Sequence, residues 1–146
     1  MKVLRGSNKV TDLVVGNGAC QFPDVTAFDL SVYPRLETLS IGNRSMTEVG
    51  ELKVIGLSEL KSVIIGMNSF MKMDSSGDEH NGRFYLKNCP KLKSLMIGPY
   101  SFSDYSVIEI ENVNALEVIE MGDLNENSYN FRYASLELKS ILIHRE

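Results

Sequence analysis

Apolar and polar positions along this chain follow one phrase that recurs at nearly regular intervals. The template Leu-x-x-Leu-x-Ile-Gly, with other aliphatic residues allowed at its apolar positions, matches six segments whose first residues are Val10, Leu36, Leu60, Leu92, Leu116 and Leu138. The copies start 26, 24, 32, 24 and 22 residues apart, and the last one has His144 where the glycine is expected. Periods of roughly 20 to 50 residues are typical of solenoids. The phrase therefore describes the whole molecule rather than one duplicated loop.

Two further elements recur between the copies. Eight and six residues before a leading leucine stands a pair of apolar residues, namely Phe28/Leu30, Leu52/Val54, Phe84/Leu86 and Ile108/Ile110. Three and four residues after the glycine comes a Ser-Phe pair or a related form, namely Ala19-Cys20, Ser45-Met46, Ser69-Phe70 and Ser101-Phe102. For the fifth copy we expect the equivalent at Ser128-Tyr129, displaced along the chain.

The spacing within the phrase predicts strands rather than helices. Apolar residues recur at every second position, as at Leu39 and Ile41, which is typical of a strand. The segment between Phe102 and Ile108 is too short for a stable helix. We therefore predict a β-rich solenoid of about six stacked coils, with two short strands per coil and little or no helix. The inward residues expected to stack in its core include Val63, Ile65, Leu95, Ile97, Ile119 and Met121. The recurring glycine fits either a turn with positive φ or a close approach between coils.

The domain organisation follows from the same repeat. Residues 1–9 form an N-terminal flank, and residues 10–146 form one solenoid domain. The third interval is longer than its neighbours, which predicts an inserted loop at residues 71–83. A pattern that begins and ends in mid-repeat is also what a fragment of a longer protein would give.

These motifs resemble those of the leucine-rich repeats, whose core phrase is L-x-x-L-x-L. The G-x-x-S-F element looks most like that of the short BspA-like or Treponema-type repeats of bacterial and protist surface proteins, in which I-G-x-x-A-F recurs. The resemblance covers residues 10–143, although here I-G-x-x-S-F follows the main strand directly and no long helical segment is visible. It implies a scaffold that binds other proteins, with the main strands in a parallel sheet along a concave face where partners dock.

The outward-facing positions of the main strands supply the candidate partner-binding residues, because inward and outward side chains alternate along a strand. They are the second and fourth residues after each leading residue. From the second copy to the sixth these are Thr38, Ser40, Ser62, Ile64, Ser94, Met96, Val118, Glu120, Ser140 and Leu142. The first copy adds Asp12 and Val14. This set carries little charge, and its aliphatic members stand where a solvated surface would be polar.

Two functions fit this surface. The first is a non-catalytic protein–protein interaction scaffold that binds a partner through the outward face of the main sheet. The alternative is a structural module that self-associates into homodimers or larger arrays, with Met96 and Leu142 central. Short flanks leave an end strand as a second route to self-association, but the sheet face buries more apolar area. These exposed aliphatic side chains would also be explained without either function if the sheet simply tolerates them, or if another part of a larger protein covers them.

Composition narrows the classes of partner and compartment. The 146 residues are 43% apolar and 23% charged, which is typical of one globular domain, and the net charge of -4 argues against nucleic acid. The sequence contains no long apolar run for membrane insertion, and "MKVLRGSNKV" does not resemble a signal peptide. Cys20 and Cys89 belong to different columns of non-neighbouring coils, so no disulfide is expected between them. This slightly favours the cytoplasm without deciding the compartment.

The sequence offers little chemistry for catalysis. It contains no nucleophile elbow, phosphate loop or dinucleotide fingerprint, so we predict no enzyme and no cofactor. Asp74, Asp78, Glu79 and His80 lie in the inserted loop, but their spacing matches no calcium loop, and no metal site is expected there. The charged residues that directly follow the leading residues are Glu37, Lys61, Lys93, Glu117 and Lys139, which predicts a surface charge ladder.

Overall fold

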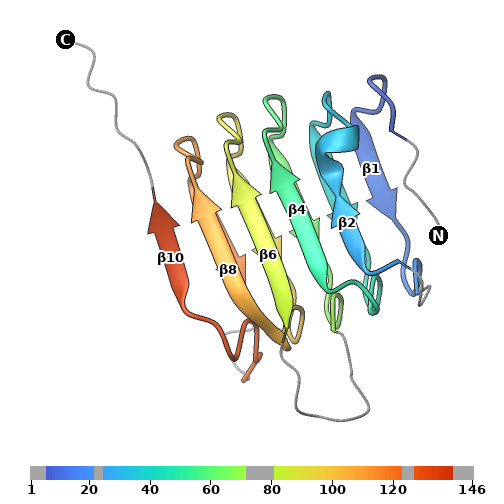
Figure 1. Cartoon of the computed structure of the whole chain (residues 1–146), viewed down its shortest axis with the longest axis vertical. Coiled ribbons are helices and arrows are strands. Elements are labelled where there is room, and N and C mark those ends of the chain that lie inside the picture. The colour runs from blue at the N-terminus through green and yellow to red at the C-terminus, as the bar shows by residue number, and fades with distance from the viewer. Residues whose placement is uncertain (1–5, 22–24, 72–80, 123–126, 140–146) are drawn as a thin grey trace.

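The computed structural model describes residues 6–21, 25–71, 81–122 and 127–139, and within them ten strands form two parallel five-stranded sheets (Figure 1). The main sheet consists, in spatial order, of β1 (Asp12–Val15), β3 (Thr38–Ile41), β5 (Ser62–Ile65), β7 (Ser94–Ile97) and β9 (Val118–Met121). The companion sheet consists of β2 (Ala27–Asp29), β4 (Glu51–Ile55), β6 (Gly82–Lys87), β8 (Tyr105–Glu111) and β10 (Leu136–Lys139).

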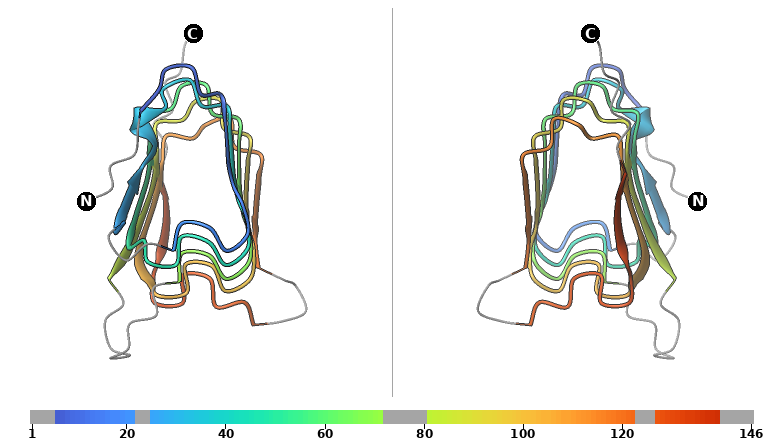
Figure 2. Two further views of the ribbon diagram at one scale, coloured as in Figure 1. Left: turned by 90° about the vertical axis from the view of Figure 1, so that its right-hand side faces the viewer. Right: turned by 90° about the vertical axis from the view of Figure 1, so that its left-hand side faces the viewer.

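The two sheets are the opposite walls of a β-rich solenoid. Each coil contributes one strand to the main sheet and the next strand of the chain to the companion sheet, so the coils lie behind one another when seen along the axis (Figure 2). The one helix in the described residues is the 3-10 turn η1 (Leu30–Val32). The predicted fold class is confirmed, with five coils in the described part of the chain where we expected about six.

The strands of the main sheet pair in register, and the inward residues form continuous rows. Leu95 lies between Val63 and Ile119 in one row, and Ile97 occupies the next inward row. The four inward residues of β5 and β7 are at most 3% exposed. Ile119 and Met121 in β9 are only partly buried, because they belong to the last described coil. The predicted stack of inward residues is therefore confirmed, with a less covered end.

Buried serines join successive coils at the corner that follows the main sheet. Ser45, Ser69 and Ser101 are all 0% exposed. Ser69 Oγ donates to the carbonyl oxygen of Gly42 at 2.7 Å and accepts the backbone N–H of Ser45 at 3.2 Å. Both partners belong to the preceding coil, and Ser45 and Ser101 make the same type of contact. The serine of the repeat thus satisfies backbone groups that the corner would otherwise bury without a partner.

Replacing Ser69 by alanine is expected to lower the free energy of unfolding by about 1–3 kcal/mol, because a buried carbonyl oxygen and a buried N–H lose their hydrogen bonds. Urea denaturation followed by circular dichroism measures this loss. Ser58 is exposed, and Ser58→Ala is the matched control with an expected change near zero. Equal stabilities for the two variants would contradict a structural role for the ladder.

An aromatic stack fills the core beside the serines. The rings of Phe70 and Phe102 are stacked at 4.8 Å, and those of Phe102 and Phe131 at 4.9 Å. Tyr105 meets the Phe102 ring edge-on at 4.9 Å, and its hydroxyl donates to the carbonyl oxygen of Val49. Burial raises the pKa of Tyr105, so this hydroxyl stays a neutral donor.

The repeated glycine serves a close approach between coils. A Cβ on Gly98 would lie 2.6 Å from the backbone nitrogen of Met67 in the preceding coil. In the regular coils the positive φ values fall two and four residues further along, for example at 55° in Asn68 and 52° in Phe70, whereas Gly122 of the last described coil has a φ of 74° itself. Large side chains rarely adopt this conformation, so the aromatic stack has to hold it.

The fifth corner differs from our expectation. Its equivalent of the Ser-Phe pair is Asn130-Phe131, and the expectation of Ser128-Tyr129 was wrong. Asn130 Nδ2 donates to the carbonyl oxygen of Gly98 at 2.8 Å, which is the role that Ser101 Oγ fills toward Gly66 one coil earlier. Phe131 continues the aromatic stack. More residues separate Gly122 from this pair than in the regular coils, so everything after it is displaced along the chain.

The displacement also changes the role of Leu138. β10 pairs with β8, and Leu138 lies opposite Ile110 in the companion sheet. Its assignment as the leading residue of a sixth main strand was therefore wrong. Lys139 lies opposite Glu111 and does not belong to the charge ladder of the main sheet. Ser140 and Leu142 lie outside the described residues.

Candidate functional site

The outward face of the main sheet brings eight of the ten predicted partner-binding residues together, and the other two are Ser140 and Leu142. The parallel register places Thr38, Ser62, Ser94 and Val118 in one row and Ser40, Ile64, Met96 and Glu120 in the adjacent row. We call these two rows the main face. Because strands β3 to β9 hold the side chains in fixed positions, the main face is a preorganised surface.

The main face is uncharged through its middle and carries large apolar side chains. Ile64 is 45% exposed, Met96 38% and Val118 44%. The two rows in β3, β5 and β7 contain only hydroxyl-bearing and apolar residues. Charged residues appear at the two ends, where β1 carries Asp12 and β9 carries Glu120.

Hydrogen bonds keep the carboxylate at the β1 end ionised. Thr38 Oγ1 donates to Asp12 Oδ1 at 2.5 Å, and Thr11 Oγ1 donates to Asp12 Oδ2 at 3.0 Å. The hydroxyl of Thr38, followed by that of Thr11, lowers the pKa of Asp12. The Thr38 hydroxyl is thereby engaged within the protein.

An ion pair borders the main face where its strands begin. Lys61 Nζ lies 2.8 Å from Glu37 Oε1, and the hydrogen bond to this carboxylate raises the pKa of Lys61. The backbone N–H of Lys61 also donates to the carbonyl oxygen of Glu37, and Lys93 repeats this contact with Lys61. The predicted column of charged residues is therefore present from Glu37 to Glu117, with an ion pair between Glu37 and Lys61, and it gives the main face a polar rim.

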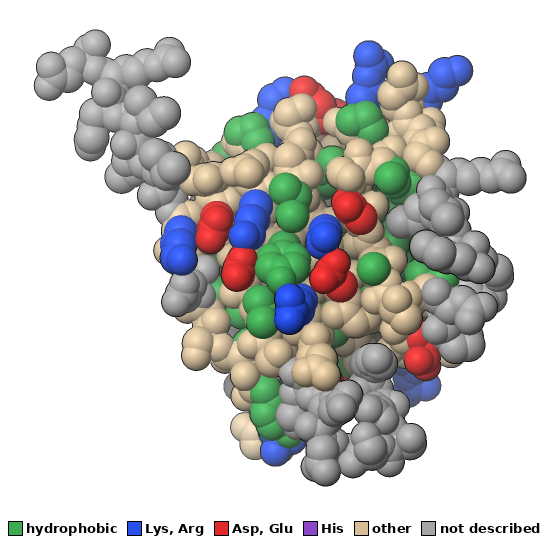
Figure 3. All heavy atoms as spheres, in the orientation of Figure 1, with side chains coloured by type: hydrophobic (Ala, Val, Ile, Leu, Met, Phe, Trp, Pro, Cys, Tyr) green, Lys and Arg blue, Asp and Glu red, His purple; other side chains and the backbone are tan. Residues whose placement is uncertain are grey.

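The companion sheet presents a different surface. Lys87 Nζ lies 2.5 Å from Glu109 Oε2 and 3.7 Å from Glu111 Oε2, and the hydrogen bond to Glu109 is the largest cause that raises the pKa of Lys87. Lys87 also lies over the ring of Tyr85, at 5.3 Å from its centroid. Figure 3 shows acidic and basic side chains interspersed over this sheet. The companion face is thus a solvated, ion-paired surface, in contrast to the main face.

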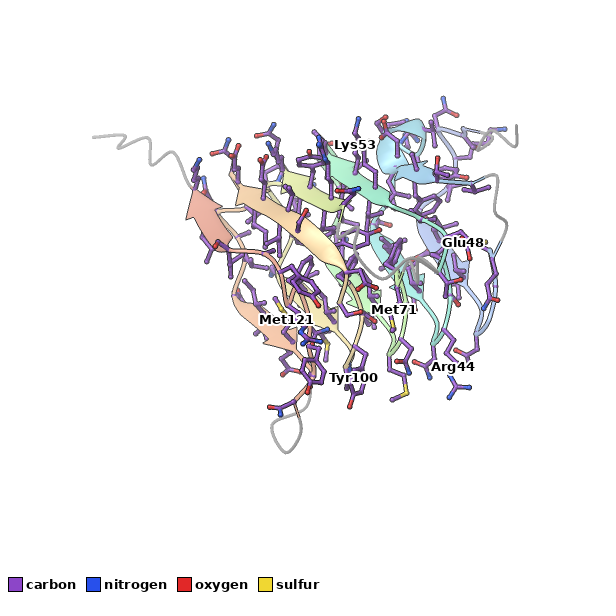
Figure 4. The ribbon with its side chains drawn as sticks, turned by 60° about the horizontal axis from the view of Figure 1, so that its bottom comes forward. Arg44, Glu48, Lys53, Met71, Tyr100 and Met121 are labelled. Carbon is purple, nitrogen blue, oxygen red and sulfur yellow. The ribbon has the colours of Figure 1, made fainter. Side chains whose placement is uncertain are left out.

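A shallow hollow of about 490 Å³ lies at the corner of the first three coils. Its lining residues are Gln21, Arg44, Thr47, Glu48, Asn68 and Met71. Figure 4 shows Arg44 and Glu48, which belong to the corner of the second coil, and Met71, which belongs to that of the third. The hollow holds one cationic and one anionic side chain, which gives it no preference for a ligand of either charge.

Metal and thiol chemistry receive no support from the described parts of the chain. No group of three His, Cys, Asp or Glu side chains gathers there in a way that could hold a metal ion. Asp74, Asp78, Glu79 and His80 lie outside the described residues. Cys20 and Cys89 are free thiols, and burial raises the pKa of Cys89. Among the described residues, no helix is long and apolar enough to span a membrane.

The comparisons with known proteins give no relative. No family model, no curated protein and no solved structure matches the chain.

Sequence reasoning missed one apolar surface, which lies on the last coil. Leu136 is 49% exposed and Leu138 is 59% exposed. The signal for their true position was present in the sequence, because residues eight and six before Leu138 are the polar Asn130 and Arg132 instead of an apolar pair. Leu136 and Leu138 are themselves the apolar pair of the fifth coil.

Proposed function

We propose that this protein is a non-catalytic protein–protein interaction scaffold of the leucine-rich-repeat type, which binds a partner through the main face. The observation that carries the proposal is the patch of half-exposed aliphatic side chains at Ile64, Met96 and Val118, on a face that is uncharged through its middle. Apolar patches with a polar border are typical of protein interaction sites. The leucine-rich-repeat assignment rests on the L-x-x-L-x-I phrase of the main strands.

The chemistry of the main face defines the partner that fits it. An extended apolar centre with serine hydroxyls beside it suits an uncharged protein surface that carries aliphatic or aromatic side chains and a few hydrogen-bonding groups. The carboxylates of Asp12 and Glu120 at the two ends disfavour an acidic partner. Binding of this kind requires neither a cofactor nor a metal ion.

Replacing both Ile64 and Met96 by glutamate is expected to weaken partner binding more than ten-fold, because two apolar contacts of about 1.5 kcal/mol each are replaced by charges that must be desolvated. The immobilised protein and this variant are compared for the proteins that each retains from a lysate of the source cells, with quantitative mass spectrometry. The matched control is Tyr85→Glu, which places a charge at a central, partly buried position of the companion sheet. The proposal requires proteins that the wild type and the control retain and the double variant loses, and identical profiles for all three chains would refute it.

Self-association is the second candidate function. A homodimer through the main face with Met96 and Leu142 at its centre stays a prediction, since Leu142 lies outside the described residues.

A further inference from the structure

The aliphatic side chains at the centre of the main face are exposed although coils lie on both sides of them. Ile64 is in β5, between β3 and β7, and Met96 is in β7, between β5 and β9. The two stand opposite one another in the parallel register and are 45% and 38% exposed. Their exposure therefore does not come from an end of the solenoid, and only an object that lies on the face itself can bury them.

The main face is long and narrow. Each of its central strands has two outward residues, about 7 Å apart, and Glu37, Lys61 and Lys93 border the face where the strands begin. From Asp12 in β1 to Glu120 in β9, four strand spacings of about 4.8 Å and one step of about 7 Å along a strand give a span of roughly 20 Å. An α-helix with its side chains is about 10–12 Å wide, so the face matches one helix of about 15 residues.

The backbone groups of the central strands are already used between coils. β5 pairs in register with β3 on one side and with β7 on the other. An extended peptide that crossed over these strands would bury its own N–H and C=O groups without partners. A helix satisfies its backbone internally and presents only side chains. The main face therefore favours a helix over an extended segment.

The spacing of the apolar side chains agrees with a helix that crosses the strands. Ile64 and Met96 lie on adjacent strands, which are about 4.8 Å apart. Residues three or four apart on one side of a helix are about 5–6 Å apart. Successive apolar residues of such a helix can therefore contact successive coils of the solenoid.

Charge argues against a second copy of this chain as the occupant. Asp12 and Glu120 are exposed carboxylates on the main face. A two-fold axis parallel to the strands would lay Asp12 of one copy over Glu120 of the other, and an axis across the strands would bring each carboxylate near its own counterpart. Both arrangements juxtapose like charges. A face of roughly 20 Å by 12 Å also falls well short of the roughly 800 Å² per partner of a stable dimer.

We infer that the partner presents an amphipathic α-helix of about 15 residues, which lies across the main strands. One side of this helix carries aliphatic residues at positions i, i+3 or i+4, and i+7, which cover Ile64 and Met96. A lysine or arginine near each end of the helix faces Asp12 and Glu120. This inference rests on the scaffold function proposed above and adds the structural class and the charge of the partner.

A displayed library of random peptides of about 15 residues, selected on the immobilised full chain, tests the inference. We expect the wild type to enrich sequences that the Ile64→Glu, Met96→Glu double variant does not retain. These sequences should have apolar residues with helical periodicity and a basic residue near each end. Circular dichroism should show that the corresponding synthetic peptides gain helix when they bind, and it also confirms that the double variant is folded.

Removal of the two carboxylates is a milder second test. Asp12→Asn with Glu120→Gln is expected to weaken binding of a selected basic-ended peptide about three- to ten-fold in fluorescence anisotropy, because two exposed ion pairs are lost. The matched control is Glu51→Gln with Glu109→Gln, which removes the same charge from the companion sheet and should leave the affinity unchanged.

Four results would each overturn the inference. They are no enriched sequences, enriched sequences with the period of a strand or with acidic ends, equal retention by the double variant, and equal losses for the two charge variants. A wild-type dimer that the double variant loses in sedimentation velocity would overturn it too, in favour of a second copy. Proteins retained from a lysate through the main face would then still support the scaffold, whereas identical lysate profiles refute the scaffold itself.

Discussion

Replacing Phe102 by alanine is expected to lower the free energy of unfolding by about 3–5 kcal/mol. Phe102 is 0% exposed and its ring lies between those of Phe70 and Phe131, with centroid distances of 4.8 and 4.9 Å. Tyr105 and Phe84 close two further sides, at 4.9 and 5.0 Å. The substitution opens a cavity that is bounded by aromatic rings of three coils. Hydrogen bonds between the corners hold these coils in place, so the cavity does not collapse.

Equilibrium unfolding in urea measures this loss, and Tyr129→Ala is the matched control. Tyr129 has a φ of 52° and Phe102 a φ of 58°, so both substitutions act on the same strained backbone conformation. Tyr129 is 44% exposed, and its ring is tilted against that of Tyr100 with the centroids 6.0 Å apart. We expect a loss below about 1 kcal/mol for the control. Similar losses for the two variants would show that the backbone conformation, and not the buried stack, carries the stability.

The regular coils were predictable because one period governs both their local structure and their packing. Alternation of Leu39 and Ile41 with polar neighbours requires a strand with one buried face, and a shift of one residue in register would expose that face. The same alternation placed Ile64 and Met96 on the outside, where the structure has them. Fold class and main face therefore followed from a single physical constraint.

The fifth coil was not predictable from the repeated phrase alone. An insertion shifts its residues along the chain, but the phrase still finds a match at the old spacing. Leu138 matches the leading position of the phrase, yet it pairs with Ile110 in the companion sheet. Asn130 replaces serine at the corner and still reaches the carbonyl oxygen of Gly98, so the residue type concealed the equivalence. Only the missing apolar pair at Asn130 and Arg132 marked the displacement.

The exposure of the last coil depends on neighbours rather than on residue type. Leu136 and Ile108 occupy the same core row, but one is 49% exposed and the other 3%. Sequence patterns assign both to the core, since the pattern carries no information on whether another coil follows. From the sequence, we favoured the main face over an end strand for self-association because of its larger apolar area.

The second large effect is expected at Leu95, where alanine should lower the free energy of unfolding by about 2–5 kcal/mol. Leu95 is 0% exposed and lies in register between Val63 and Ile119. Strands on both sides fix its neighbours, so the cavity left by the side chain stays largely open. Differential scanning calorimetry should show a corresponding fall in the melting temperature, and urea denaturation gives its free energy.

The neighbouring residue Met96 provides the control for Leu95, because it has a similar size and lies in the same strand but faces outward and is 38% exposed. Met96→Ala should cost less than about 1 kcal/mol, and Lys93→Ala, at an exposed position before the strand, should be nearly neutral. The loss of stability should be largest for Leu95→Ala and at least as large for Met96→Ala as for Lys93→Ala. This order indicates a strand with one buried and one solvated face. If Met96→Ala were as damaging as Leu95→Ala in the isolated chain, the main face would already be covered in solution by contacts between copies. The main face would then be an interface of the homodimer, and the proposed partner-binding role would have to be assigned elsewhere on the solenoid.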